Sequence, residues 1–100
     1  MTYKKTHIQT IQDGKYFDHK LLTKDGLLLI KVRVFGKILD AFHSDDGEYS
    51  TITLEDFASN IKAKAFKEQV GLLKDLKTGQ TIDIFGRVRE FEGEKYLLPP

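Results

Sequence analysis

Cysteine is absent from the 100-residue sequence, and its absence excludes several kinds of site at once. Without thiols the chain forms no disulfide, no thiolate-ligated zinc site and no cysteine nucleophile. A cysteine-free chain fits a reducing compartment, so we expect a cytoplasmic protein. The three histidines are scattered, with no two at the spacing of a metal-binding motif, and no glycine-rich phosphate loop occurs.

Long hydrophobic runs are also missing. The longest, residues 27–30, has the length of a strand, whereas a membrane-spanning helix needs roughly 18 apolar residues. The first five residues lack the apolar stretch of a signal peptide, so we expect no contact with a membrane. The length fits one domain and is small for an enzyme. We therefore expect a non-catalytic binding module that needs no cofactor.

The net charge of +1 is far from the strongly basic balance of a protein dedicated to duplex DNA. The charge is uneven along the chain, however. Residues 1–35 hold seven Lys and Arg against three Asp and Glu, whereas residues 36–56 hold one against six. This pattern allows local positive patches on a nearly neutral body, and an ordinary mixed surface would give it as well.

Apolar and polar residues alternate along most of the chain, as they do in half-buried strands. We expect five strands, around residues 30–38, 49–55, 60–65, 81–91 and 95–98. Gly36 and Gly86 interrupt the first and fourth of these, and such single glycines predict a bulge or a bend. We interpret residues 6–11 as a short lead-in strand, followed by a turn at Asp13 and Gly14.

One segment has the period of a helix instead. Phe66, Val70, Leu73 and Leu76 fall on one helical face, and Gly79 follows as a stop signal. We expect all four apolar side chains, Phe66 included, to lie in the core. The order of three strands, a helix and two strands predicts an all-β, five-stranded Greek-key barrel with one capping α-helix between strands three and four, the OB architecture. A ferredoxin-like fold would need two helices.

Three blocks of sequence extend this interpretation. They read VRVFGKILD, YSTITLEDFASNIKAKAFKEQV and LKTGQTIDIFGRVREFEGEKYLLP. Together they resemble the single-stranded-DNA-binding OB domains of replication protein A, most closely the archaeal type, over residues 27–98. The resemblance implies an OB domain at residues 27–100 that binds single-stranded DNA in replication or repair. Residues 1–26 are left as an N-terminal extension that packs on the barrel.

Two features depart from this family. The family usually has a glycine in the turn between strands two and three, whereas this turn carries Phe57 at its tip and Asn60 at its end. The first loop carries Asp45, Asp46 and Glu48, which put negative charge where a nucleic acid strand often passes.

Binding of a single strand needs cations for the phosphates and aromatic faces for the bases. In an OB barrel the outward residues of strands two and three and the adjoining loops supply them. The resemblance implies one stacking ring near the start of strand two, beside Ser50, and another in the last hairpin. With the outward residues of the other strands, the predicted nucleic-acid-binding set is Arg33, Phe35, Tyr49, Thr51, Lys62, Lys64, Arg87, Arg89 and Tyr96.

Two alternatives to DNA binding stay open. The acidic first loop, the small net charge and the outward Phe35, Phe57 and Phe85 favour an OB subunit that binds other proteins. The same barrel also occurs in RNA-binding and tRNA-binding OB domains. The expected partners are therefore single-stranded DNA or RNA, and other OB subunits or tandem domains if the chain is part of a longer protein.

Overall fold

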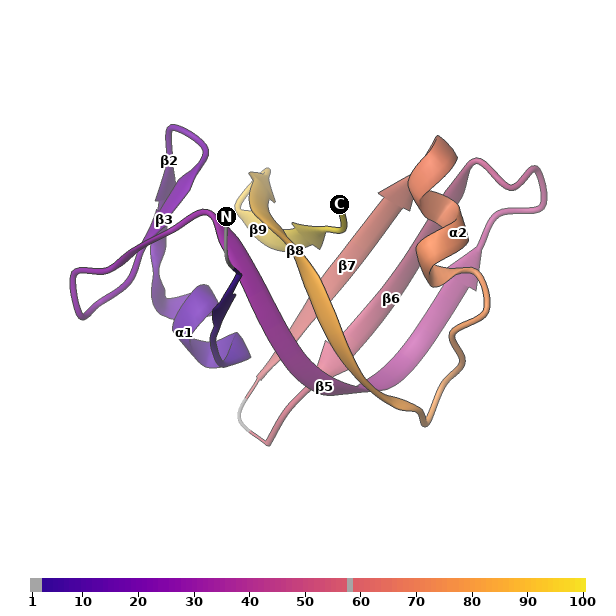
Figure 1. Ribbon diagram of the computed structural model, residues 1–100, viewed down its shortest axis with the longest axis horizontal. Coiled ribbons are helices and arrows are strands. Elements are labelled where there is room, and N and C mark those ends of the chain that lie inside the picture. Colours follow the sequence, from indigo (N-terminus) through magenta and orange to yellow (C-terminus); the bar gives the residue numbers. More distant parts are fainter. Residues whose placement is uncertain (1–2, 58) are drawn as a thin grey trace.

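The computed structural model describes residues 3–57 and 59–100, which form a closed five-stranded barrel with a small sheet beside it (Figure 1). The barrel strands are β5 (Lys31–His43), β6 (Tyr49–Glu55), β7 (Asn60–Phe66), β8 (Thr81–Phe91) and β9 (Glu94–Leu98). They lie in the order β5-β6-β7-β9-β8, and β8 pairs with β5 to close the barrel. The pairing is antiparallel except between β7 and β9. The predicted Greek-key barrel is confirmed.

Alternation along these strands fills the barrel with aliphatic side chains. The inward residues are buried, and they are Val32, Val34, Ile38, Ile52, Leu54, Ile61, Ala63, Ala65, Ile84, Val88 and Leu97. The residues between them point outward and form the surface of the barrel, and they include several exposed phenylalanines as well as polar residues.

The irregularity in β5 lies three residues beyond its glycine. The ladder with β6 shifts register between Ile38 and Asp40, so Leu39 is an extra residue that exchanges the inward and outward positions after it. Gly36 does not interrupt the alternation of inward and outward residues. Glycine is needed there because the backbone of β5 passes close to that of β6, and a Cβ at residue 36 would lie 2.8 Å from the carbonyl oxygen of Glu55.

The expectation of a lead-in strand at residues 6–11 is wrong. The strand β1 (Lys4–Lys5) lies before this range, paired in parallel with β5, and helix α1 (Ile8–Asp13) follows it. Ile8 and Ile11 are three residues apart, so both reach the core from one helical face. The backbone N–H of Ile8 donates to a carboxylate oxygen of Asp56 over 3.1 Å, which ties α1 to the β6–β7 turn.

The small sheet consists of β2 (Lys15–Phe17), β3 (Lys20–Leu22) and β4 (Leu28–Leu29). Leu21 and Leu29 belong to the same buried cluster as the barrel core. The N-terminal segment therefore packs on the barrel through α1 and this sheet.

The helical segment between β7 and β8 is shorter than predicted. A 3-10 turn, η1 (Lys67–Gln69), leads into helix α2 (Val70–Leu73). Val70 and Leu73 are buried as expected. The prediction of a buried Phe66 is wrong, because Phe66 is still in the β7 ladder, on its outer side, and the positive φ of Lys67 turns the chain only after it. No helix in the described part of the chain is long and apolar enough to cross a membrane.

Candidate nucleic-acid interface

The outer surface of β6 and β7 presents hydroxyl and ammonium groups side by side. Thr51 lies directly opposite Lys64, and Thr53 lies opposite Lys62. All four alternate with buried residues, so their side chains point away from the core. This two-stranded surface is the centre of the candidate site.

Tyr96 joins this surface from β9. It is the register partner of Lys62 on one side and of Arg89 on the other. The Nζ of Lys64 lies 4.6 Å from the centroid of the Tyr96 ring. The same Nζ lies 3.2 Å from a carboxylate oxygen of Glu94, so an internal acid holds one of the predicted phosphate-binding cations.

An aromatic cluster of Phe42, Tyr49 and Phe66 forms the other end of the surface. The Tyr49 ring centroid is 5.1 Å from that of Phe66 and 6.2 Å from that of Phe42. The Tyr49 hydroxyl is 3.2 Å from the hydroxyl of Thr51, which links the cluster to the strand surface. Of these three rings, only Tyr49 belongs to the binding set predicted from the sequence.

The outward orientation of Phe42 could also have been predicted from the sequence. Strict alternation through β5 would put Asp40 and Phe42 inside the barrel and leave an aspartate in the core. A bulge at Leu39 removes this conflict, because it turns Asp40 and Phe42 outward and Ala41 inward. The polar residue at an inward position was therefore the sign of the register shift.

Arg33 and Phe35 lie elsewhere, on the outer surface shared by the first half of β5 and by β8. Asp83 binds Arg33 there, with 2.7 Å between Nε and the carboxylate oxygen and a second contact from the terminal nitrogen. The hydrogen bond and the charge of Asp83 raise the pKa of the guanidinium. The remaining seven predicted residues share the continuous outer surface of β6, β7, β9 and β8, where Arg87 and Arg89 occupy the far end.

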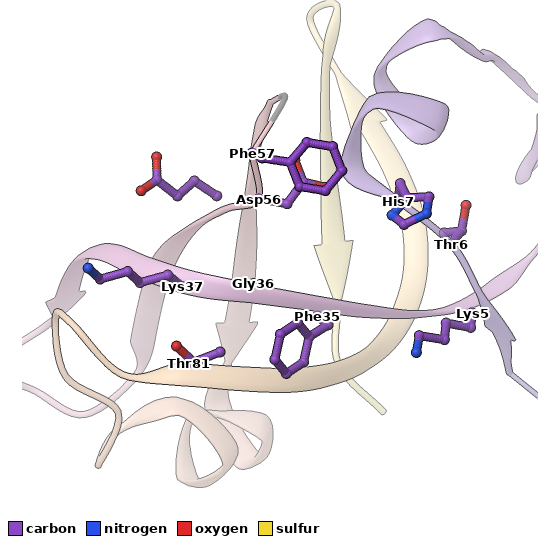
Figure 2. A pocket seen from close by; sticks show the side chains of 10 residues that line it. Lys5, Thr6, His7, Phe35, Gly36, Lys37, Asp56, Phe57 and Thr81 are labelled. Carbon is purple, nitrogen blue, oxygen red and sulfur yellow. The ribbon is translucent and has the colours of Figure 1, made fainter.

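Phe35 lines a groove of about 630 Å³ at the bend of β5, which we call the β5 groove. The β6–β7 turn with Phe57, the residues after β1 and Thr81 of β8 form its other walls (Figure 2). Figure 2 shows Lys5 and Lys37 at its two ends. Phe35 is 58% exposed and Phe57 is 93% exposed, so neither ring is buried in the core.

The acidic loop between β5 and β6 is fixed by its own hydrogen bonds. The carboxylate of Asp46 accepts from the Glu48 backbone N–H over 2.9 Å and from the Ser44 hydroxyl over 2.7 Å. These bonds, that of Glu48 first, lower the pKa of Asp46. Within residues 3–57 and 59–100, no cluster of three His, Asp or Glu side chains is arranged to hold a metal ion.

A family model described as an OB-fold nucleic acid binding domain, under the label tRNA anti-codon, matches residues 32–99. The chain belongs to this family. A search of curated protein sequences found no match. The predicted OB domain is thereby confirmed, and its family is one of nucleic-acid-binding modules.

Solved structures show the same OB fold. A chain of the S. pombe Stn1–Ten1 complex superposes with a TM-score of 0.85 and 11% identity, covering 99% of this chain and 75% of that one. A chain of a replication protein A heterotrimer bound to single-stranded DNA gives 0.81 and 12%, covering 99% and 77%. A small single-stranded-DNA-binding protein of Mycoplasma pneumoniae gives 0.53 and 19%, covering 72% and 82%. The first two matches extend over the N-terminal segment as well as the barrel.

Proposed function

We propose that this OB domain binds single-stranded DNA, without catalysis, on the outer surface of β6, β7 and β9. The observation that carries the proposal is the Lys64–Tyr96 pair, an ammonium group and a half-buried ring, on a surface that also presents Lys62 and two threonines. Aromatic rings and cations that alternate along a groove or face are what a single strand needs, because bases stack on the rings while cations hold the phosphates.

The two aromatic positions define how the strand lies. Tyr49 is opposite Phe66 and Tyr96 is opposite Lys62, four residues apart on β7. At a rise of about 3.3 Å per residue the two positions are roughly 13 Å apart along the strand direction. Because β6 and β9 lie on opposite sides of β7, the two positions are also about 9–10 Å apart across the strands. This span fits a segment of a few nucleotides, near the lower end of the range of about 4–16 nucleotides for one OB fold.

The likeness to a chain of replication protein A bound to single-stranded DNA supports a role in replication or repair, in which the domain coats a strand and prevents it from reannealing. Stacking and phosphate contacts do not depend on base identity, so binding of this kind tolerates many sequences.

The test is a fluorescence titration with oligothymidine at several salt concentrations. With four phosphates neutralised, the logarithm of the affinity should fall against the logarithm of salt with a slope of about −3. Tyr96→Ala should weaken binding by about 1–3 kcal/mol. Phe17→Ala is the control, since Phe17 is an exposed phenylalanine in the small sheet. No binding at about 50 mM salt would overturn the proposal, and a stronger affinity for oligouridine would redirect it to RNA.

A second candidate function is docking of another OB-fold subunit in the β5 groove. The exposed rings of Phe35 and Phe57 are the observation that favours it. Lys5 and Lys37 stand against Glu55 and Asp56 around the groove, so its charge is balanced and suits a protein better than a polyanion. The S. pombe and replication protein A matches are both to chains of multi-subunit assemblies.

Light scattering with size exclusion tests the simplest form of this candidate, in which the second subunit is another copy of the chain. A mass of two chains that returns to one in Phe57→Ser would support docking at the groove. One chain in both proteins would contradict self-docking.

A further inference from the structure

Three cations gather at the β8 end of the candidate interface. Lys31 of β5 and Arg87 of β8 are direct cross-strand partners on the outer surface, and Arg89 follows two residues later on β8. Together with Tyr3 and Gln69 they line a cavity of about 290 Å³, which we call the cationic cavity. The other described residues that line it are Leu98, Pro99 and Pro100, so no Asp or Glu side chain is among them. Among the described residues, none of the three cations takes part in an ion pair.

This arrangement is unfavourable for the free domain. Like charges directly opposite each other on adjacent strands destabilise a sheet. The neighbouring Arg33, two residues from Lys31 on β5, shows the usual solution, because Asp83 of β8 neutralises it. The Lys31 ammonium instead lies 5.6 Å from the centroid of the Tyr3 ring, which carries no charge. An uncompensated group of three cations is explained by an anionic ligand.

We propose that the cationic cavity holds phosphate groups of the same nucleic acid strand that lies on β6 and β7. This inference rests on the proposed function. The strand pairing places these residues in a continuous row that the nucleic acid can follow. Lys62 of β7 is the register partner of Tyr96 of β9, and Tyr96 is the register partner of Arg89 of β8. Arg87 and Lys31 then continue the path to β5. The strand therefore crosses β9 and ends over the junction of β8 and β5.

The chemistry of the lining suits phosphate. Two guanidinium groups offer forked N–H donors that match phosphate oxygens, and the Gln69 amide can add a neutral donor. A terminal nitrogen of Arg89 donates to the Val88 carbonyl oxygen over 3.2 Å, which anchors that side chain while its other N–H groups remain for a ligand.

The test compares Lys31→Gln and Arg87→Gln with Lys77→Gln, which removes the same charge from an exposed lysine in the segment between α2 and β8. Each cavity variant should raise the thermal midpoint of the free domain, because repulsion between the partners is relieved. Each should also lower the affinity for oligothymidine about three- to tenfold and reduce the salt slope by about 0.7. The control should change neither the midpoint nor the slope to this extent. Opposite changes in stability and affinity are the signature of a ligand site.

The other outcomes separate the two proposals. If Tyr96→Ala weakens binding while both cavity variants keep the affinity and slope of the wild type, the cavity proposal is overturned and the proposed function stands. If inorganic phosphate alone stabilises the wild type but not the variants, and oligothymidine affinity is unchanged in them, the cavity is a small-anion site and the proposal is again overturned. Absence of oligothymidine binding by the wild type overturns both.

Discussion

Lys64 and Glu94 form an ion pair, with 3.2 Å between Nζ and the nearer carboxylate oxygen, on the surface proposed to bind nucleic acid. The Lys64 side chain is 19% exposed and that of Glu94 is 50% exposed. The carboxylate thus occupies a position that a phosphate oxygen would take in a complex. A bound strand has to displace Glu94 from Lys64 or share the ammonium group with it.

Removing this competition should strengthen binding. Glu94→Gln keeps the shape of the side chain but frees the charge of Lys64, and a partly exposed ion pair is worth about 0.2–1 kcal/mol. We therefore expect oligothymidine affinity to rise by up to about fivefold, measured by fluorescence titration. Glu92→Gln is the control in the same hairpin turn, because it removes one negative charge that lies in no ion pair among the described residues. Equal gains in the two variants would show a general charge effect and contradict displacement of Glu94.

The loop carboxylate Asp46 should titrate at unusually low pH. Hydrogen bonds from Glu48 and Ser44 lower its pKa in the folded protein. A lowered folded pKa means that this group contributes its full stability above the ordinary aspartate pKa of about 3.9 and loses it as the pH falls through the folded value. Carbon-detected NMR of the side-chain carboxyl, followed from neutral to acid pH, should give a midpoint below the ordinary value. Ser44→Ala should move the midpoint upward, and an unchanged midpoint in this variant would contradict the contribution assigned to the Ser44 hydroxyl.

The barrel was predictable because the alternation of inward and outward residues is a pattern within each strand and recurs from strand to strand. Alternation in β6 and β8 predicted their bounds to the residue. The pattern is not strict, since Ser50 faces inward and Phe85 and Phe91 face outward. The short helix α1 was not predictable in this way. Its apolar pair, Ile8 and Ile11, is too short a pattern to separate a helix from a strand, and its anchor, the bond to Asp56, comes from 48 residues away.

The candidate site was predictable only where alternation held. Tyr49, Lys64 and Tyr96 follow the parity of their strands, and the structure brings them to one surface. Phe66 was assigned to the core because its spacing also fits the helix that follows, and only the turn at Lys67 decides between the two. The cross-strand contact of Lys31 with Arg87 depends on the register between two strands, and the two residues are 56 positions apart in the sequence, so no local pattern specifies it.

Gly36 and Gly71 should respond in opposite ways to a single added methyl group. A Cβ at Gly36 would lie 2.8 Å from the Glu55 carbonyl oxygen, a backbone atom that cannot move without disturbing the β5–β6 junction. Gly36→Ala should therefore cost about 1–3 kcal/mol of the free energy of unfolding. Gly71 lies in α2 with open space around it, so Gly71→Ala should gain up to about 1 kcal/mol. Urea denaturation measures both, and a neutral Gly36→Ala would show that the barrel does not need this close approach.

The aromatic cluster provides the sharpest test of where bases stack. Phe42 is 56% exposed and contacts the edge of the cluster through Tyr49, so its removal takes little from the core. If a base stacks there, Phe42→Ala should weaken oligothymidine binding by about 1–3 kcal/mol while the thermal midpoint changes little. Phe17→Ala, which removes an equally large exposed ring from the small sheet, should leave the affinity unchanged. Unchanged affinity in Phe42→Ala, with a loss in Tyr96→Ala, would confine the stacked bases to the β9 end of the surface and leave the cluster a packing role.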